Sequence, residues 1–187
     1  MKDNTLSIVV VGASGNLALN KIIPAFFSLY CQGFLPDEFN LYGFARSVMN
    51  NEEFRALIAE KLTCRYTPGE KDCSGKTESF LERCFYVQGE YGSVDSYLNL
   101  YMLMRENSGL LCNRIFYLAV PPVVFSDVAR AIGDSGLVSC TDDEPWSRVV
   151  VEKPFGEDRE SSDNLIAQLS DIFTESQTYR IDHYLGK

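Results

Sequence analysis

The sequence predicts an α/β fold, a doubly wound parallel sheet, and two observations carry that prediction. Short apolar runs alternate with helical patterns along the chain, which is typical of a parallel sheet covered by helices. The first run is followed at once by a glycine turn and a helix, the context of a dinucleotide-binding segment. The 187 residues, 45% of them hydrophobic, are enough for one such domain with a substantial core.

The first predicted strand is Ile8–Val11, and Gly12 and Gly15 lie in the turn that follows it. Gly12 permits the sharp turn, Gly15 lets the backbone approach a pyrophosphate, and Ala18 keeps the helix close to the strand. Phosphate groups would bind the exposed N–H groups at the helix N-terminus. Apolar residues at helical spacing define this helix: Leu17, Ala18, Ile22, Ala25, Phe26 and Leu29. The alternative, a strand–turn–helix without a ligand, is less favoured because of the strand-to-helix context.

The second predicted strand, 39–44, is followed by Arg46 and Ser47. In a dinucleotide fold this position faces the adenine ribose. An acidic residue there binds the free 2′-hydroxyl of NAD, whereas an arginine suits the 2′-phosphate of NADP. Arg46 is therefore predicted to select the coenzyme, with Ser47 as a second donor; the alternative is a solvated arginine at a strand end.

The remaining chain continues the alternation of strands and helices. Helices are expected at 51–62, 77–83, 93–106, 123–133 and 161–173, and strands at 84–88, 114–120 and 148–151. Pro121 and Pro122 stop the strand 114–120 and start the next helix. An irregular insertion is expected at 63–77.

Charge and composition exclude several classes of function. The net charge of −9 makes a nucleic-acid surface a poor prediction. No apolar run approaches the roughly 20 residues of a membrane span, and the first residues, MKDNTLS, contain no signal segment. The six cysteines form no CxxC pair and there is a single histidine, so no metal site is expected.

The cysteines fall into two groups. Cys31 and Cys84 lie in apolar stretches and are expected to be buried thiols. Cys64 and Cys73 flank a polar loop, and two interpretations are open: two free thiols near the surface, which the residues alone favour, or a reversible disulfide that acts as a redox switch.

Cationic groups are expected to meet at the carboxyl edge of the sheet. Lys21 lies on the first helix, Lys153 follows the strand 148–151, and the end of the chain is rich in donors: Arg180, Asp182, His183, Tyr184 and Lys187. This concentration predicts an anion site. The alternative is an ordinary solvated, charged tail.

Five segments together resemble the amino-terminal half of the glucose-6-phosphate 1-dehydrogenase family: GASGNLALNKIIPA, YGFARS, NRIFYLAVPP, VVVEKPFGEDRESSDNL and QTYRIDHYLGK. The resemblance covers essentially the whole chain, and EKPFG and RIDHYLGK are its most specific parts. It implies oxidation of D-glucose 6-phosphate to 6-phospho-D-glucono-1,5-lactone with NADP as hydride acceptor, the first step of the oxidative pentose phosphate pathway. It also implies a Rossmann-like NADP-binding domain over 1–176 and the start of a substrate-binding region at 177–187, without the β+α domain that follows in the family.

The resemblance implies roles for individual residues. His183, Tyr184 and Lys187 match positions that hold the sugar phosphate, and Asp182 shapes their pocket. The positions that match the coenzyme site are Gly12, Ser14, Gly15, Asn16, Leu17, Lys21, Arg46, Ser47, Lys153 and Pro154; of these, Lys153 also contacts the substrate, and Pro154 links the two sites.

The general base of the family, a histidine paired with an aspartate, lies beyond RIDHYLGK, and this sequence has no second histidine. We therefore expect no catalytic residue within these 187 residues and no appreciable dehydrogenase activity from them alone.

The segment LTCRYTPGEKDCSGK resembles the plastid-type enzymes of plants and algae. This resemblance implies that Cys64 and Cys73 form a pair that thioredoxin reduces, and that the protein resides in the plastid stroma; the alternative compartment is the cytoplasm. The family also implies a homo- or hetero-oligomer formed through the domain that is absent here.

The first motif departs from the family pattern GASGDLAKKK, because this chain has Asn16, Leu19 and Asn20. Asn16 is expected to cap the helix, and the loss of two lysines removes positive charge beside the coenzyme. The alternative function is therefore a non-catalytic homologue that partners an active subunit. A third interpretation, an unrelated NADP-linked reductase, predicts a YxxxK pair after the fourth strand, and the sequence lacks it there.

Overall fold

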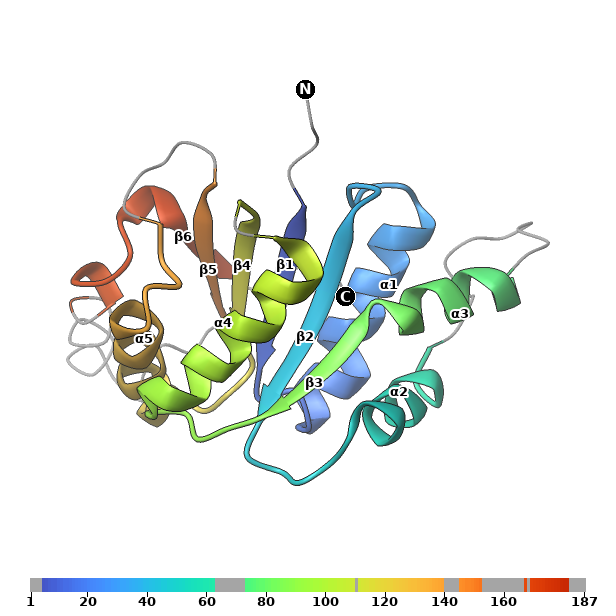
Figure 1. Cartoon of the computed structure of the whole chain (residues 1–187), viewed down its shortest axis with the longest axis horizontal. Coiled ribbons are helices and arrows are strands. Elements are labelled where there is room, and N and C mark those ends of the chain that lie inside the picture. The colour runs from blue at the N-terminus through green and yellow to red at the C-terminus, as the bar shows by residue number, and fades with distance from the viewer. Residues whose placement is uncertain are drawn as a thin grey trace.

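The computed structural model describes residues 5–62, 73–109, 111–139, 145–152, 167 and 169–181. Within these ranges six parallel strands form one sheet in the order β3-β2-β1-β4-β5-β6 (Figure 1). The strands are β1 (Leu6–Val11), β2 (Phe39–Ala45), β3 (Cys84–Gln88), β4 (Asn113–Leu118), β5 (Ser147–Glu152) and β6 (Thr178–Ile181). The chain order reverses at β1, which lies between β2 and β4, so the predicted doubly wound parallel sheet is confirmed.

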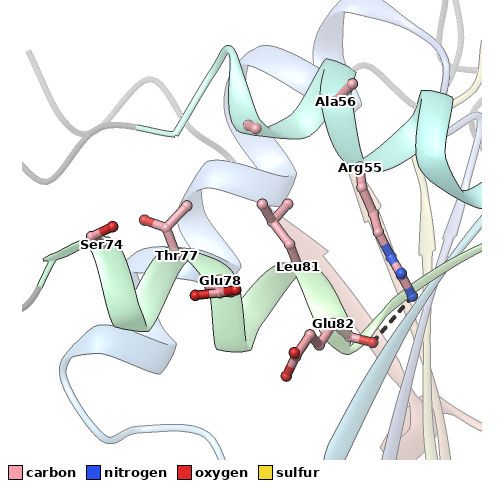
Figure 2. A pocket seen from close by; sticks show the side chains of 8 residues that line it. Arg55, Ala56, Ser74, Thr77, Glu78, Leu81 and Glu82 are labelled. Carbon is pink, nitrogen blue, oxygen red and sulfur yellow. Dashed lines mark hydrogen bonds between the residues drawn. The ribbon is translucent and has the colours of Figure 1, made fainter.

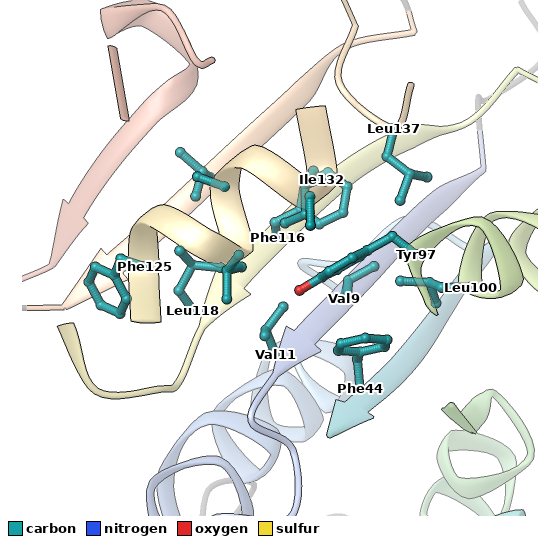
Figure 3. Packing of buried hydrophobic residues seen from close by; sticks show 14 of the residues in the cluster. Val9, Val11, Phe44, Tyr97, Leu100, Phe116, Leu118, Phe125, Ile132 and Leu137 are labelled. Atoms are coloured by element: carbon teal, nitrogen blue, oxygen red, sulfur yellow. The ribbon is translucent and has the colours of Figure 1, made fainter. Parts of the chain in front are cut away.

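Helices cover both faces of the sheet (Figure 1). One face packs against α1 (Ile23–Cys31), α2 (Asn51–Ala59) and α3 (Cys73–Glu82). The other face packs against α4 (Val94–Ser108) and α5 (Phe125–Asp134), as Figure 3 shows. Because side chains alternate along a strand, Ile8 and Val10 of β1 enter the first layer, whereas Val9 and Val11 enter the second.

The helix after the glycine turn opens with a π-helical turn, Ala18–Ile22, before α1 begins. Pro24 explains this turn, since it has no N–H to donate to the carbonyl of residue 20. The N–H of Ile23 instead donates to the carbonyl of Ala18, five residues back.

The extra residue in the π-turn changes which face of α1 is buried. Ala18, Ile23 and Phe27 are buried at five- and four-residue steps. The apolar residues predicted to define this helix were therefore wrong in its second half: Ala25 is exposed, and Leu29 is 38% exposed. A regular 3.6-residue pattern cannot show such a change of phase.

Other elements differ from the predictions at their ends. The helix expected at 77–83 is α3 and begins at Cys73, and the strand expected at 114–120 is β4 and ends at Leu118. A short 3₁₀ turn, Pro122–Val124, precedes α5. Most of the helix expected at 161–173 lies outside the described residues, although Leu169 and Phe173 are buried in the core.

Strand β6 was not predicted. It is four residues long, lies at the edge of the sheet and is mostly exposed, so its sequence TYRI shows no hydrophobic alternation. Beside it, the guanidinium of Arg148 lies 4.0 Å from the ring centre of Trp146 and 5.4 Å from that of Tyr179. The sheet thus extends through residues 178–181, and the boundary expected at 176 stays a prediction.

Two further sequence expectations concern membranes and thiols. Within the described residues, no helix has the length and apolar character needed to span a membrane. Cys84 is buried as expected, and Cys112 is buried too, whereas Cys31 is only partly buried. Burial raises the pKa of the Cys84 thiol well above its usual range, which makes it unreactive.

We expect Gly12→Ala to destabilise the fold more than Gly33→Ala. Both glycines have positive φ, +89° and +73°, so alanine costs about 1–2 kcal/mol at each from backbone strain. At Gly12 an added Cβ would also lie 2.4 Å from the Ala119 carbonyl oxygen, whereas at Gly33 it would meet nothing within 4 Å. Urea denaturation should give a loss of about 3 kcal/mol or more for Gly12→Ala. Equal losses in the two variants would contradict the close packing at Gly12.

Candidate functional site

The predicted glycine turn leaves the carboxyl end of β1 and is tied to β2. The N–H groups of Gly12 and Ala13 donate to the carbonyl of Phe44, at 2.8 and 3.2 Å. The turn closes when the N–H of Gly15 donates to the carbonyl of Gly12, at 2.9 Å. A Cβ at Gly15 would lie 3.1 Å from that oxygen, a tight contact, whereas at Gly12 it would lie 2.4 Å from the Ala119 carbonyl oxygen, so close backbone packing requires a glycine at residue 12 and favours one at residue 15.

The first turn of the helix presents unpaired N–H groups. Within the described residues, the N–H of Leu19 finds an acceptor in the carbonyl of Gly15, but those of Ser14, Asn16 and Leu17 make no hydrogen bond to the chain. These donors lie at the positive end of the helix dipole, an arrangement that suits an anion such as a phosphate.

The structure corrects the expected role of Asn16. Residue 16 already belongs to the helix, so the boundary position is Gly15 and Asn16 does not cap. Its carbonyl accepts a 2.9 Å hydrogen bond from the side-chain amide of Asn20.

The two other departures in this motif have separate structural explanations. Leu19 is only 9% exposed and packs in the core under α1, where a lysine would lose solvation. Asn20 and Lys21 are exposed. Lys21 therefore remains as a surface cation on this helix, and Leu19 contributes packing instead of charge.

At the end of β2, Arg46 and Ser47 lie beside the glycine turn. The hydroxyl oxygens of Ser14 and Ser47 are 2.9 Å apart, which joins the two segments directly. Arg46 is exposed, and no carboxylate among the described residues pairs with it. A guanidinium at this edge without a carboxylate partner among the described residues can bind a phosphate through several donors.

Tyr91 is a site residue that the sequence analysis missed. It lies in the turn between β3 and α4, and the Arg46 guanidinium is 5.0 Å from its ring centre. Burial raises the pKa of the Tyr91 hydroxyl, and the nearby Arg46 charge partly opposes this shift. An aromatic residue just after a strand at the carboxyl edge is the signal that could have identified it.

A buried polar pair lies farther along the same edge, on β4 and β5. The Tyr117 hydroxyl donates to the Glu152 carboxylate, and both residues are at least nine-tenths buried. Burial and this hydrogen bond raise the pKa of Tyr117 far above its usual range, so the hydroxyl stays a donor. Glu152 directly precedes the predicted site residue Lys153.

Several predicted site residues lie outside the described residues: Cys64, Lys153, Pro154, Asp182, His183, Tyr184 and Lys187. Cys73 is described only as the first residue of α3. Arg180, expected among the anion-site donors, instead forms two hydrogen bonds with the Glu175 carboxylate, at 2.5 and 2.8 Å. Its guanidinium is therefore already paired.

A groove in the described part of the chain lies elsewhere, between α2 and α3 (Figure 2). It has a volume of about 610 Å³, and none of its eight lining residues is a predicted site residue. Arg55 at its end donates to the carbonyls of Glu82 and Cys84, at 3.2 and 2.9 Å, which explains this arginine as a structural link. The described residues contain no cluster of three potential metal ligands.

A comparison with protein families shows to which family this chain belongs. The family model described as "Glucose-6-phosphate dehydrogenase, NAD binding domain" matches residues 9–187. The chain belongs to the glucose-6-phosphate dehydrogenase family. The resemblance inferred from the five sequence segments is thus confirmed, and the chain corresponds to the coenzyme-binding domain of this family.

Curated glucose-6-phosphate dehydrogenases match almost the whole chain. The chloroplastic enzyme 1 of Arabidopsis thaliana is 46% identical over 186 residues, 99% of this chain and 31% of the relative. The chloroplastic enzyme of Spinacia oleracea is 46% identical over 187 residues, 100% of this chain and 32% of the relative. Two further A. thaliana relatives are 42% identical to this chain. One is named a cytoplasmic glucose-6-phosphate 1-dehydrogenase, and the other is named an inactive chloroplastic one.

A solved structure of glucose-6-phosphate dehydrogenase, described as a complex with its substrate glucose-6-phosphate, has the same fold. Its TM-score is 0.85 at 35% identity, and the match covers 99% of this chain and 38% of that one. The chain therefore spans about a third of the length of the relatives that it matches.

We expect this glucose-6-phosphate dehydrogenase domain to lose stability as the pH rises above 10. Burial raises the pKa of five tyrosines, that of Tyr86 to about 12: Tyr42, Tyr86, Tyr91, Tyr97 and Tyr117. In the unfolded chain tyrosines ionise near pH 10, so above this pH the unfolded state binds fewer protons and the free energy of unfolding falls.

The measurement is absorbance at alkaline pH, which follows tyrosine ionisation, together with chemical denaturation. We expect a group of tyrosines to ionise only on unfolding. Ionisation of all ten tyrosines near pH 10 in the folded chain would contradict their burial.

Proposed function

We propose that this chain is the coenzyme-binding part of a glucose-6-phosphate 1-dehydrogenase that oxidises D-glucose 6-phosphate to 6-phospho-D-glucono-1,5-lactone and reduces NADP. One observation carries the proposal: the glycine turn and Arg46 share one edge of the sheet in a chain that matches the family over residues 9–187. Because the chain spans about a third of its relatives, the activity of the whole protein is inferred from the family.

The described residues fit NADP. The unpaired N–H groups of Ser14, Asn16 and Leu17 would bind the pyrophosphate, which approaches closely because Gly12 and Gly15 have no side chain. Arg46, with Ser47, would bind the 2′-phosphate, and this contact would favour NADP over NAD. When bound, the coenzyme supplies the hydride acceptor.

The predicted substrate residues fit a sugar phosphate by their chemistry. Lys153, His183 and Lys187 can carry positive charge, and Tyr184 can donate a hydrogen bond. With Asp182 orienting its neighbour, these groups would hold the dianionic phosphate and present C1 to the coenzyme. A base that takes the C1 hydroxyl proton would come from the part of the family protein beyond residue 187.

The alternative is a non-catalytic homologue that partners an active subunit. One relative is named an inactive glucose-6-phosphate 1-dehydrogenase. The geometry of the turn favours an active enzyme instead. Leu19 is buried in the core, and the Asn20 amide binds the Asn16 carbonyl, so neither substitution occupies the unpaired N–H groups.

We further propose a plastid location with regulation by thioredoxin. The support is the similarity to chloroplastic relatives and the resemblance of the loop around Cys64 and Cys73 to plastid-type enzymes. Relatives named cytoplasmic make the cytoplasm the alternative compartment. A homo- or hetero-oligomer through the remainder of a full-length protein is part of the same proposal.

We expect Arg46→Ala to weaken NADP binding by about ten- to a hundred-fold and to leave NAD binding nearly unchanged. The change removes charge-assisted hydrogen bonds to the 2′-phosphate, which NAD lacks. Calorimetry with both coenzymes measures this, and Arg105→Ala is the matched control because Arg105 is exposed on α4 and is not a predicted site residue.

Equal affinity for the two coenzymes, unchanged by Arg46→Ala, would contradict the proposed role of this arginine. A folded protein that binds neither coenzyme would favour the non-catalytic partner instead.

We expect mild oxidation to link Cys64 and Cys73, and a dithiol to reverse the link. Mass spectrometry of peptides before and after reduction measures this, and Cys73→Ser should abolish the linked peptide. The buried Cys84 and Cys112 are internal controls that should resist alkylation in both states. The redox switch is absent if Cys64 and Cys73 both alkylate freely in the oxidised protein.

A further inference from the structure

Tyr86 of β3 contacts both ends of the loop that carries Arg46. The loop, residues 46–50, joins β2 to α2. The Tyr86 hydroxyl donates its single proton to the carbonyl of Ser47 at 2.6 Å, and the carbonyl of Ala45, 3.4 Å away, is a weaker second contact. The hydroxyl therefore contacts the backbone on both sides of Arg46. The Tyr86 N–H donates to the side-chain oxygen of Asn51, the first residue of α2, at 2.6 Å.

The position of Tyr86 is itself well fixed. Its side chain is 8% exposed and its ring centre lies 5.2 Å from that of Phe54 on α2. Gly43 of β2 lies opposite Tyr86 in the sheet register. Burial raises the pKa of Tyr86 to about 12, so the hydroxyl remains a donor well above physiological pH.

The exposed segment would otherwise have few restraints. Arg46, Ser47 and Val48 are all exposed, Val48 by 84%. Among the described residues, the other contacts of Arg46 and Ser47 are the Ser14–Ser47 hydroxyl pair and the Arg46–Tyr91 ring contact. The far end of the loop is held by the reciprocal hydrogen bonds between Asn50 and Glu53, at 2.7 and 2.9 Å. Exposed loops with so few contacts are conformationally variable, and ordering them on binding costs free energy.

We propose that Tyr86 is a positioning residue for coenzyme selectivity: it holds the backbone on both sides of Arg46 so that this arginine and Ser47 are preorganised for a 2′-phosphate. The inference rests on the proposed function, because it requires Arg46 to bind that phosphate. Tyr86 itself touches no part of the coenzyme and acts through the loop.

The test is Tyr86→Phe in the intact protein, with NADP and NAD affinities measured by calorimetry. We expect NADP binding to weaken about five-fold, as for the loss of one net hydrogen bond, and NAD binding to change by less than about two-fold. Tyr42→Phe is the matched control. It also removes a buried hydroxyl, one 3.2 Å from Ser108 at the end of α4, and should leave the ratio of the two affinities unchanged.

A double-variant cycle separates positioning from general loosening. In an Arg46→Ala background, Tyr86→Phe should cause no further loss of NADP affinity, since no guanidinium remains to be positioned. Asn51→Ala keeps the tyrosine, removes the second anchor at an exposed site and should lower the NADP preference in the same direction.

Three outcomes would overturn the inference. Tyr86→Phe could weaken the binding of NADP and of NAD equally. Tyr86 would then have a purely structural role. Tyr86→Phe could leave the preference for NADP unchanged although Arg46→Ala abolishes it. This result would contradict the role of Tyr86 but not that of Arg46. A wild-type protein without an Arg46-dependent preference for NADP would defeat the proposed function and this inference together.

Discussion

The close approach of three backbones at Gly12 is the constraint on which the site depends. The N–H groups of Gly12 and Ala13 donate to the end of β2, the N–H of Ala119 donates to Val11, and the Gly12 α-carbon faces the Ala119 carbonyl. Any side chain at residue 12 would separate β1 from β4. The positions of the helix N-terminus, of Arg46 and of the Tyr117–Glu152 pair all follow from this packing, because each lies at the carboxyl end of a strand that is paired there.

Much of the fold could be predicted from sequence because most of the strands are short, apolar and buried. The strand 84–88 has the predicted bounds, and the glycine turn lies where the residue pattern placed it. Two features could not be predicted, for different reasons. The π-turn depends on the effect of Pro24 on a hydrogen bond, and β6 forms because β5 offers an edge, without a hydrophobic pattern of its own.

The site was predictable to a similar degree and for similar reasons. Gly12 and Arg46 follow from the order strand, turn, helix and strand, which is local information. Tyr91 and Tyr86 contact the Arg46 loop only because β3 lies beside β2, and their spacing from Arg46 in the sequence carries no signal. The motif shows that this chain has Leu19 where the family pattern has a lysine. Its structural consequence becomes clear only from the structure, in which the Leu19 side chain is buried.

The ring contacts of Arg148 have a spectroscopic consequence. Trp146 is the single tryptophan of the chain, and the Arg148 guanidinium that lies over its ring also lies over the ring of Tyr179, on the edge strand β6. Indole emission is sensitive to a neighbouring charge and to solvent. The protein thus carries a natural fluorophore at the junction of β5 and β6, which reports whether the last strand of the sheet is attached without any label being introduced.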